Sequence, residues 1–228
     1  ATTEAFAEWF SIDPPFPDGI FGDEKIVGGA YCNGGIMPLV GGELARAYLQ
    51  SGFEAEGLET LRKYHQLISR KDETFLWYFP DGTESSVDTS TSPDATPTDG
   101  WGSSSMLYGL IEGLAGVQDQ AKHFQSVKLA PRWAAAEVAE AEVSVAYQSS
   151  EKQLQYHYEE SSERLSIKVE SEGSQLTGEI LIPADRTAKA ALQDGNRIEF
   201  TETRIGDSRY VCFQSEFKGG SEFEIQLH

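Results

Sequence analysis

The hydrophobic period of this chain changes near residue 131, and this change constrains the fold more than any other feature of the sequence. Before it, apolar residues recur at helical spacing in the segments 38–52, 55–72 and 103–117. After it, they alternate with polar residues in short runs. A period of 3.6 indicates amphipathic helices, and a period of two indicates half-buried strands. We therefore predict an α+β chain with a helical domain at 1–126 and a β-sandwich at 127–228.

Both parts of the chain carry their own boundary signals. Ser103 or Ser104 can cap the third helical segment, and Gly116 can end it. Two further helices are expected around residues 2–10 and 118–126. Strand-like runs at this spacing are typical of an antiparallel sandwich, and they read VSVAY, LQYHY, RLSIKVE, LTGEILIP, RIEF, RYVCF and FEIQL.

The charge balance narrows the range of partners. The 228 residues include 18 Lys and Arg against 37 Asp and Glu, a net charge of −19. Such a charge repels phosphate backbones and anionic lipid headgroups, so we expect neither a nucleic-acid nor a membrane partner. No apolar run approaches the roughly 20 residues of a membrane span. A neutral partner such as a carbohydrate is compatible with this charge, although acidity also serves solubility.

The motifs indicate neither a cofactor nor a metal. Cys32 and Cys212 lie far apart, and the four histidines lack a metal-binding spacing. Neither a GxxxxGK[ST] phosphate loop nor a GxGxxG turn is present. His65 lies on the apolar stripe of the second helical segment, so we interpret it as a core histidine.

The first residues, ATTEAFAEWF, lack the basic start and apolar core of a signal peptide. The chain also does not begin with Met. We therefore keep a processed, trimmed or fragmentary chain as open alternatives, and we favour a periplasmic or secreted location over a cytoplasmic one.

The order of several motifs resembles one family of enzymes. The motifs, all N-terminal to or at the start of the sandwich, are YCNGGIMP (31–38), FPDGT (79–83), DGWG (99–102), EGLAGV (112–117) and VKLAPRW (127–133). Together they are similar to the C-terminal end of bacterial (α/α)6-barrel, or six-hairpin, glycosidases, whose branches include α-L-rhamnosidase-like, glucosidase-like and sugar-phosphorylase-like proteins. The resemblance spans roughly residues 26–182.

This resemblance implies both a fold and a function. The helical part would be a partial α/α toroid of helical hairpins, followed by the antiparallel sandwich. The chain would then be the C-terminal portion of a glycoside hydrolase, either with an N-terminal portion missing or as a reduced member. We expect this chain alone to be inactive. The alternative is a non-catalytic carbohydrate-binding protein or a structural interaction module.

Catalytic candidates follow from the chemistry of glycosidic bonds, whose hydrolysis uses two carboxyl groups. The resemblance implies a base in a Glu-aromatic-aromatic-Asp-Gly turn, but this sequence has Tyr78 at the Glu position. A base would then have to come from Asp81, Glu84, Asp88 or Asp99, and the catalytic candidates we retain are Asp99, Asp81 and Glu84. Asp81 could instead cap its own turn, and Asp99 could instead stabilise a helix dipole.

Aromatic and amide side chains supply the substrate-binding candidates. Flat rings can stack on the apolar faces of sugars, and Asn33 offers both a donor and an acceptor to hydroxyl groups. The alternatives are core packing for the rings and a left-handed turn position for Asn33. The substrate-binding candidates are Tyr31, Asn33, Trp77, Tyr78 and Trp101. We predict that one concave face is lined by Tyr31, Asn33, Trp77, Asp99 and Trp101.

Association is predicted from the incomplete barrel. A short arc of helices leaves the apolar flanks of its end helices uncovered, and exposed apolar patches are unusual on soluble monomers. The isolated chain is therefore expected to form small homo-oligomers, with the net charge of −19 limiting their growth.

Overall fold

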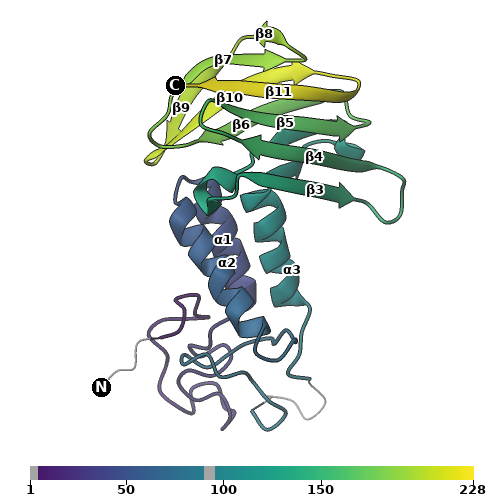
Figure 1. Ribbon diagram of the computed structural model, residues 1–228. Coiled ribbons are helices and arrows are strands. Elements are labelled where there is room, and N and C mark those ends of the chain that lie inside the picture. Colours follow the sequence, from purple (N-terminus) through teal and green to yellow (C-terminus); the bar gives the residue numbers. More distant parts are fainter. Residues whose placement is uncertain (1–4, 90–95) are drawn as a thin grey trace. The chain divides into compact units, whose positions relative to one another are not determined.

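The computed structural model describes residues 5–89 and 96–228, coloured along the chain in Figure 1. The chain divides into two compact units. The first comprises Ala1–Ala47 and Glu56–Leu110, and the second comprises Tyr48–Ala55 and Ile111–His228. The second unit therefore begins before the boundary expected at 126/127 and takes in a short segment from the helical part. None of the described helices is long and apolar enough to cross a membrane.

Helices in the described residues fall where the 3.6-residue period predicts them. They are α1 (Pro38–Gln50), α2 (Glu54–Ile68) and α3 (Trp101–Tyr108), with a π-helical turn, Gly109–Leu114, after α3. Within the first unit, α1 and α3 approach closely because Gly42 has no side chain: a Cβ there would lie 2.2 Å from the Ser105 carbonyl carbon. The Ser105 hydroxyl also donates to the Leu39 carbonyl at 2.8 Å.

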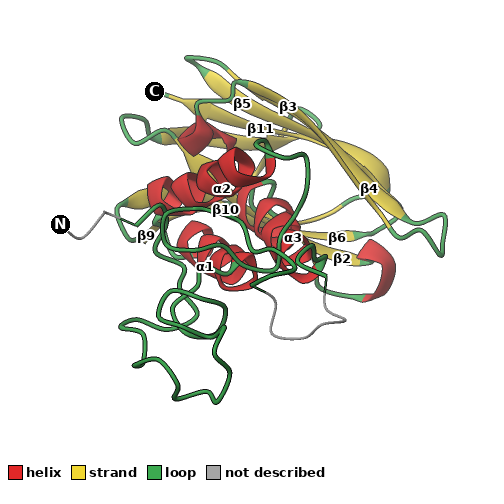
Figure 2. Cartoon of the chain, turned by 90° about the horizontal axis from the view of Figure 1, so that it is seen from below, coloured by secondary structure: helices red, strands yellow, loops and turns green. Residues whose placement is uncertain are grey.

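The part before the sandwich is less helical than predicted. The segments 5–37 and 69–100, apart from 90–95, contain no helix and form long loops, green in Figure 2. The helix expected around 2–10 is absent from 5–10, and its residues 2–4 lie outside the described residues. Around 118–126, the only helical element is the 3-10 turn Lys122–Phe124, which lies between β1 (Val117–Asp119) and β2 (Ser126–Leu129). A partial α/α toroid is therefore not evident from the three described α-helices.

The long loops of the first unit are joined by isolated bridges rather than by sheets. We refer to residues 5–37, 69–89 and 96–100 as the loop region. Ile36 pairs with both Phe10 and Tyr78, and Phe75 pairs with Thr98. A small core lies beneath these bridges, formed by Ala7, Trp9, Ile36, Tyr64, Leu67, Phe75, Tyr78 and Met106.

The second unit contains two sheets, with β3, β4, β5 and β11 adjacent to one another in the larger one (Figure 1). The smaller sheet has the order β1-β2-β6-β10-β9, with β1 (Val117–Asp119), β2 (Ser126–Leu129), β6 (Gln175–Ile182), β10 (Ser208–Glu216) and β9 (Thr201–Ile205). The larger has the order β3-β4-β5-β11-β7-β8, with β3 (Glu140–Ala146), β4 (Gln153–Glu160), β5 (Arg164–Ser171), β11 (Gly219–Leu227), β7 (Ala188–Gln193) and β8 (Asn196–Ile198).

These sheets confirm the expected sandwich-like architecture and add strands to it. Six of the seven predicted runs form strands over most of their length, and the seventh, RIEF, does so only at Arg197 and Ile198. Strand pairing in the two sheets is antiparallel except between β2 and β6. The strands β1, β2, β7 and β9 were not predicted. β7 reads AKAALQ and β9 reads TETRI, so neither has the apolar alternation on which strand prediction depends.

A polar network is buried inside the second unit. Arg132 is fully buried, and its Nη1 donates to the carbonyls of Gly113 and Ala130, each at 2.8 Å. Glu179 supplies the counter-charge at 3.5 Å and also pairs with Lys128 at 2.9 Å. A buried cation costs less when it is paired and hydrogen-bonded, so this network offsets the cost of burying the Arg132 guanidinium.

Candidate functional site

The start of α3 carries two of the predicted site residues, Asp99 and Trp101. Asp99 Oδ2 accepts the backbone N–H groups of Trp101 and Gly102, at 2.9 and 3.2 Å. The carboxylate therefore caps the helix and also lies at the positive end of its dipole. Thr74 holds the Asp99 backbone on both sides: its carbonyl accepts the Asp99 N–H at 3.0 Å, and its hydroxyl donates to the Asp99 carbonyl at 2.7 Å.

Trp101 extends from this helix start with 69% of its surface exposed. Gly102, the next residue, lies against α1, since a Cβ there would come within 2.5 Å of the Pro38 Cβ. The two helix starts are thus adjacent within the first unit, as expected from the two glycine turns. Leu39 and Val40, at the start of α1, are also exposed.

Asn33 has a different role from the two that were predicted. Its side chain is fully buried; Oδ1 accepts the Phe16 N–H at 2.7 Å, and Nδ2 donates to the carbonyls of Phe16 and Ile26 at 3.0 and 3.4 Å. These bonds hold the loop 16–26 in place. The positive φ angles of this turn belong to Tyr31 and Gly34 instead. The amide is therefore fully used inside the protein.

Trp77 and Tyr78 are core residues, as the packing alternative proposed. They are 3% and 2% exposed, and Trp77 packs edge-on against Phe79 with ring centroids 4.7 Å apart. Burial raises the pKa of Tyr78 to about 12, with the Phe75 backbone opposing this shift and Glu84 adding to it. In this conformation neither ring offers a face to a ligand, and the Tyr78 phenol stays protonated at neutral pH.

Tyr31 lies at the edge of the same turn and is half-buried. Its carbonyl accepts the Ser11 hydroxyl at 2.7 Å and the Gly35 N–H at 3.1 Å. Gly35 is required here because a Cβ would lie 2.7 Å from that carbonyl oxygen. Tyr31 thus keeps part of its ring accessible while its backbone closes the turn.

The carboxylates of Asp81 and Glu84 are stabilised in their charged forms. Asp81 is exposed, and hydrogen bonds from the backbone and side chain of Thr83 lower its pKa. For Glu84, its own backbone N–H and Lys71, at 2.9 Å, lower the pKa. A general acid needs a raised pKa, so both groups suit a base or an electrostatic role better than proton donation.

The pKa values of two buried phenols, Tyr64 and Tyr78, are influenced by the candidate carboxylates. Burial is the largest cause of the raised pKa of Tyr64, and Tyr78 and then Asp99 add to it. Burial is also the largest cause of the raised pKa of Tyr78, and Glu84 adds to it. Sequence analysis missed Tyr64 because it is a tyrosine on an apolar helical stripe, where only its ring was considered.

A polar hollow near Asp99 was also missed. Its volume is about 620 Å³, and it is lined by His65, Ile68, Ser69, Asp72, Glu73, Thr74 and Thr98. His65 is exposed here, so its interpretation as a core histidine is wrong: the apolar stripe of α2 passes through its neighbours Tyr64 and Leu67 instead. The hollow combines carboxylates, hydroxyls and an imidazole, and Thr74 connects it to Asp99.

Comparison with known proteins finds similarity in structure but not in sequence. No family model matches this chain, and no curated protein matches it significantly. An α-L-rhamnosidase from Dictyoglumus thermophilum matches 92% of this chain over 22% of its own length, with a TM-score of 0.56 and 12% identity. A Streptomyces avermitilis α-L-rhamnosidase complexed with L-rhamnose matches 86% of this chain over 18% of its own, with a TM-score of 0.52 and 16% identity.

These matches confirm the resemblance at the level of fold. The chain spans about a fifth of the length of the two rhamnosidases. The similarity extends over most of this chain, whereas the (α/α)6 barrel itself is not evident in the described residues.

Proposed function

We propose that this chain is the C-terminal portion of a carbohydrate-active protein of the glycoside hydrolase type and that its loop region contributes to a sugar-binding surface. The observation that carries the proposal is the polar hollow connected to Asp99, close in sequence to the exposed ring of Trp101. Hydroxyl-rich ligands need convergent donors and acceptors together with an apolar face. The fold shared with two α-L-rhamnosidases supports this reading.

Within this proposal the predicted residues have unequal roles. Asp99 and Trp101 are the principal substrate contacts, and Tyr31 is a secondary one. Asp99 is also the foremost candidate for a catalytic carboxylate, with Asp81 and Glu84 as alternatives for a base. The matching general acid would come from residues beyond this chain, so the chain alone should bind sugar without hydrolysing glycosides.

A non-catalytic binding protein is the second candidate function. The lowered pKa values of Asp81 and Glu84 favour it, as does the protonated Tyr78 phenol at the position of the expected glutamate. The two ionised carboxylates have no proton to give, and the buried Tyr78 phenol, with a pKa of about 12, is too weak an acid to protonate a leaving group. In this case the binding surface would be the whole of the function.

Binding and turnover should be measured together on the purified chain. L-rhamnose is the first probe, followed by a glycan array for binding and aryl glycosides for hydrolysis. We expect millimolar or tighter binding that Trp101→Ala weakens at least tenfold and Trp101→Phe partly restores, because a phenyl ring can still stack. Phe53→Ala, which removes an exposed ring from the second unit, is the matched control.

The outcomes separate the two candidates. Binding without turnover by this chain, with turnover by a longer polypeptide that contains it, supports the hydrolase. Binding without turnover by both supports the binding protein. If neither this chain nor the longer polypeptide binds sugar, the proposal is contradicted.

A further inference from the structure

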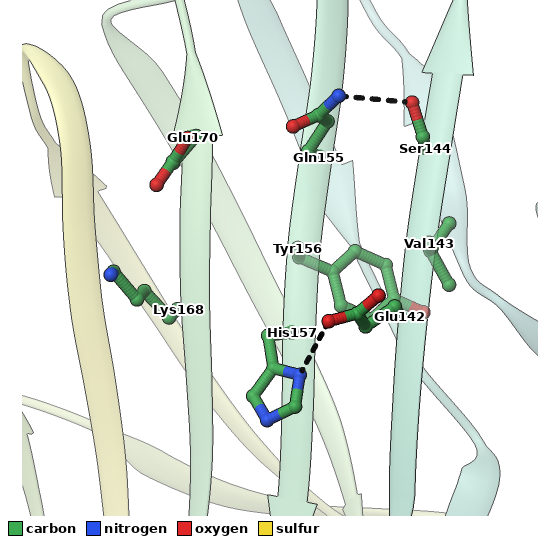
Figure 3. A pocket seen from close by; sticks show the side chains of 8 residues that line it. All are labelled: Glu142, Val143, Ser144, Gln155, Tyr156, His157, Lys168 and Glu170. Carbon is green, nitrogen blue, oxygen red and sulfur yellow. Dashed lines mark hydrogen bonds and ion pairs between the residues drawn. The ribbon is translucent and has the colours of Figure 1, made fainter.

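Two paired strands of the larger sheet place a histidine among glutamates on the solvent-facing side. In the β3–β4 ladder, Glu140 lies opposite Glu159 and Glu142 lies opposite His157. Successive residues of a strand point to opposite faces, so Tyr156 enters the core while His157 faces outward. Figure 3 shows the His157 ring beside the Glu142 carboxylate in a hollow of about 450 Å³.

The two ring nitrogens of His157 face different carboxylates. Nε2 lies 3.4 Å from Glu159 Oε1 and 3.8 Å from Glu140 Oε1. Nδ1 lies 3.8 Å from Glu142 Oε1. One nitrogen and two oxygens, from His157, Glu140 and Glu159, are all within 4.8 Å of one another.

We propose that Glu140, His157 and Glu159 bind a divalent transition-metal ion of the zinc type. Zinc binds imidazole nitrogen at about 2.0–2.1 Å and carboxylate oxygen at about 2.0–2.2 Å in a tetrahedron, which places donor atoms about 3.3–3.5 Å apart. The observed separations of 3.4 and 3.8 Å from Nε2 are close to this spacing. The three groups supply three donors, and water completes the coordination.

Glu142 gives the histidine the second contact that metal-binding imidazoles commonly have. A ligating imidazole donates its other N–H to a carboxylate, carbonyl or water, which orients the ring and fixes its tautomer. Glu142 is placed to accept from Nδ1 after a small side-chain adjustment, leaving the Nε2 lone pair for the ion. Glu142 is therefore a positioning residue rather than a ligand.

The charges around the site also favour a cation. Like charges directly across a ladder destabilise the pair, and Glu140 and Glu159 are such a pair. A bound ion would neutralise both. The adjacent strand β5 carries a positive charge, Lys168, which would repel a bound cation. Lys168 lies across from His157 in the β4–β5 ladder and lines the same hollow. Lys168 should weaken ion binding, so removing its charge should increase the affinity for the ion, whereas removing a ligand should decrease it.

The test uses the full chain, purified in EDTA and then freed of it, with Zn²⁺ titrated by calorimetry and Co²⁺ by visible absorption. We expect one ion per chain. His157→Gln should weaken binding at least tenfold, and Glu140→Gln and Glu159→Gln should each weaken it severalfold. Glu142→Gln should have a smaller effect, while Lys168→Gln should strengthen binding.

Glu170→Gln is the matched control, because it removes an exposed negative charge from the same face without removing a ligand. Its affinity should stay within twofold of the parent chain. Thermal unfolding in EDTA should be alike for all variants, since the substituted side chains face outward. Binding that survives His157→Gln, or falls equally with Glu170→Gln and Glu159→Gln, would show a diffuse attraction to the acidic surface and overturn the proposal.

Discussion

The loop region and the sandwich follow different principles, although both bury aromatic side chains. In the sandwich, twenty buried residues form one apolar cluster, and alternation along strands such as β4 separates them from the polar residues. In the first unit only eight form the corresponding cluster. Of the thirteen exposed large hydrophobic residues among those described, eleven belong to the first unit. Local pattern thus determines burial in the sandwich, whereas long-range contacts determine it in the loop region.

Two tryptophans of the first unit, Trp77 and Trp101, provide the largest test of this comparison. Trp77 is buried against Gly35 and Phe79, so Trp77→Ala should lower the free energy of unfolding by about 3–5 kcal/mol through lost burial and a cavity. Trp101 is mostly exposed, so Trp101→Ala should change it by less than about 0.5 kcal/mol. Urea denaturation followed by circular dichroism measures both. Equal losses would show that exposure in the loop region does not predict energetic role.

Asn33→Ala should have the next largest effect. It leaves the Phe16 N–H and two carbonyls without their partner, and unpaired buried polar groups cost about 1–3 kcal/mol each. Because water can reach part of the loop after the change, we expect a loss of about 2–3 kcal/mol in total. Limited proteolysis should locate the effect, with new cleavage within residues 16–26. Asn196→Ala, at the exposed first residue of β8, is the control and should leave the cleavage pattern unchanged.

The buried ion pair of the sandwich tests the other side of the comparison. Glu179→Gln removes the counter-charge of the fully buried Arg132. Loss of one partner of a buried pair costs about 3–5 kcal/mol, and the partial exposure of Glu179 and the backbone bonds to Arg132 reduce our expectation to about 2 kcal/mol. The same substitution at exposed Glu163 is the control. A negligible loss at Glu179 would mean that the backbone carbonyls alone stabilise the guanidinium.

Sequence patterns predicted the sandwich much better than the site. The strand runs were recognisable because a period of two survives wherever one face is buried, as in β4 with Leu154, Tyr156 and Tyr158 inward. Asn33 and Trp77 could not be assigned, because their burial depends on Phe16, Ile26 and Gly35 arriving from other parts of the chain or turn. The His157 cluster was missed for a related reason: its ligands come together through ladder register, not through spacing in one segment.

Alkaline pH should reveal the buried phenols. Tyr78 has a pKa of about 12 in the folded chain against an ordinary value of 10.0, so the folded state retains its proton longer than the unfolded state. Its contribution to stability is complete below pH 10 and is lost as pH rises toward 12. At pH 11 the loss should be about 1.4 kcal/mol. Tyr78→Phe should remove that share of the pH dependence, whereas Tyr31→Phe should not; an unchanged slope in Tyr78→Phe would contradict the shift.

Self-association is the prediction with the smallest expected effect on stability. Leu39, Val40, Trp101 and Leu107 are exposed on the first unit, and contiguous exposed apolar surface marks an interaction site on soluble proteins. We expect small oligomers in light scattering, favoured by high salt because it screens the net charge of −19. Leu107→Glu should shift them toward monomer while changing the free energy of unfolding of the monomer by less than about 0.5 kcal/mol. Val87→Glu, an equally exposed position outside α1 and α3, is the control. A monomer at both low and high salt would mean that these side chains are not sufficient to hold two copies together. The four exposed apolar side chains would then be better explained as contacts for a different partner.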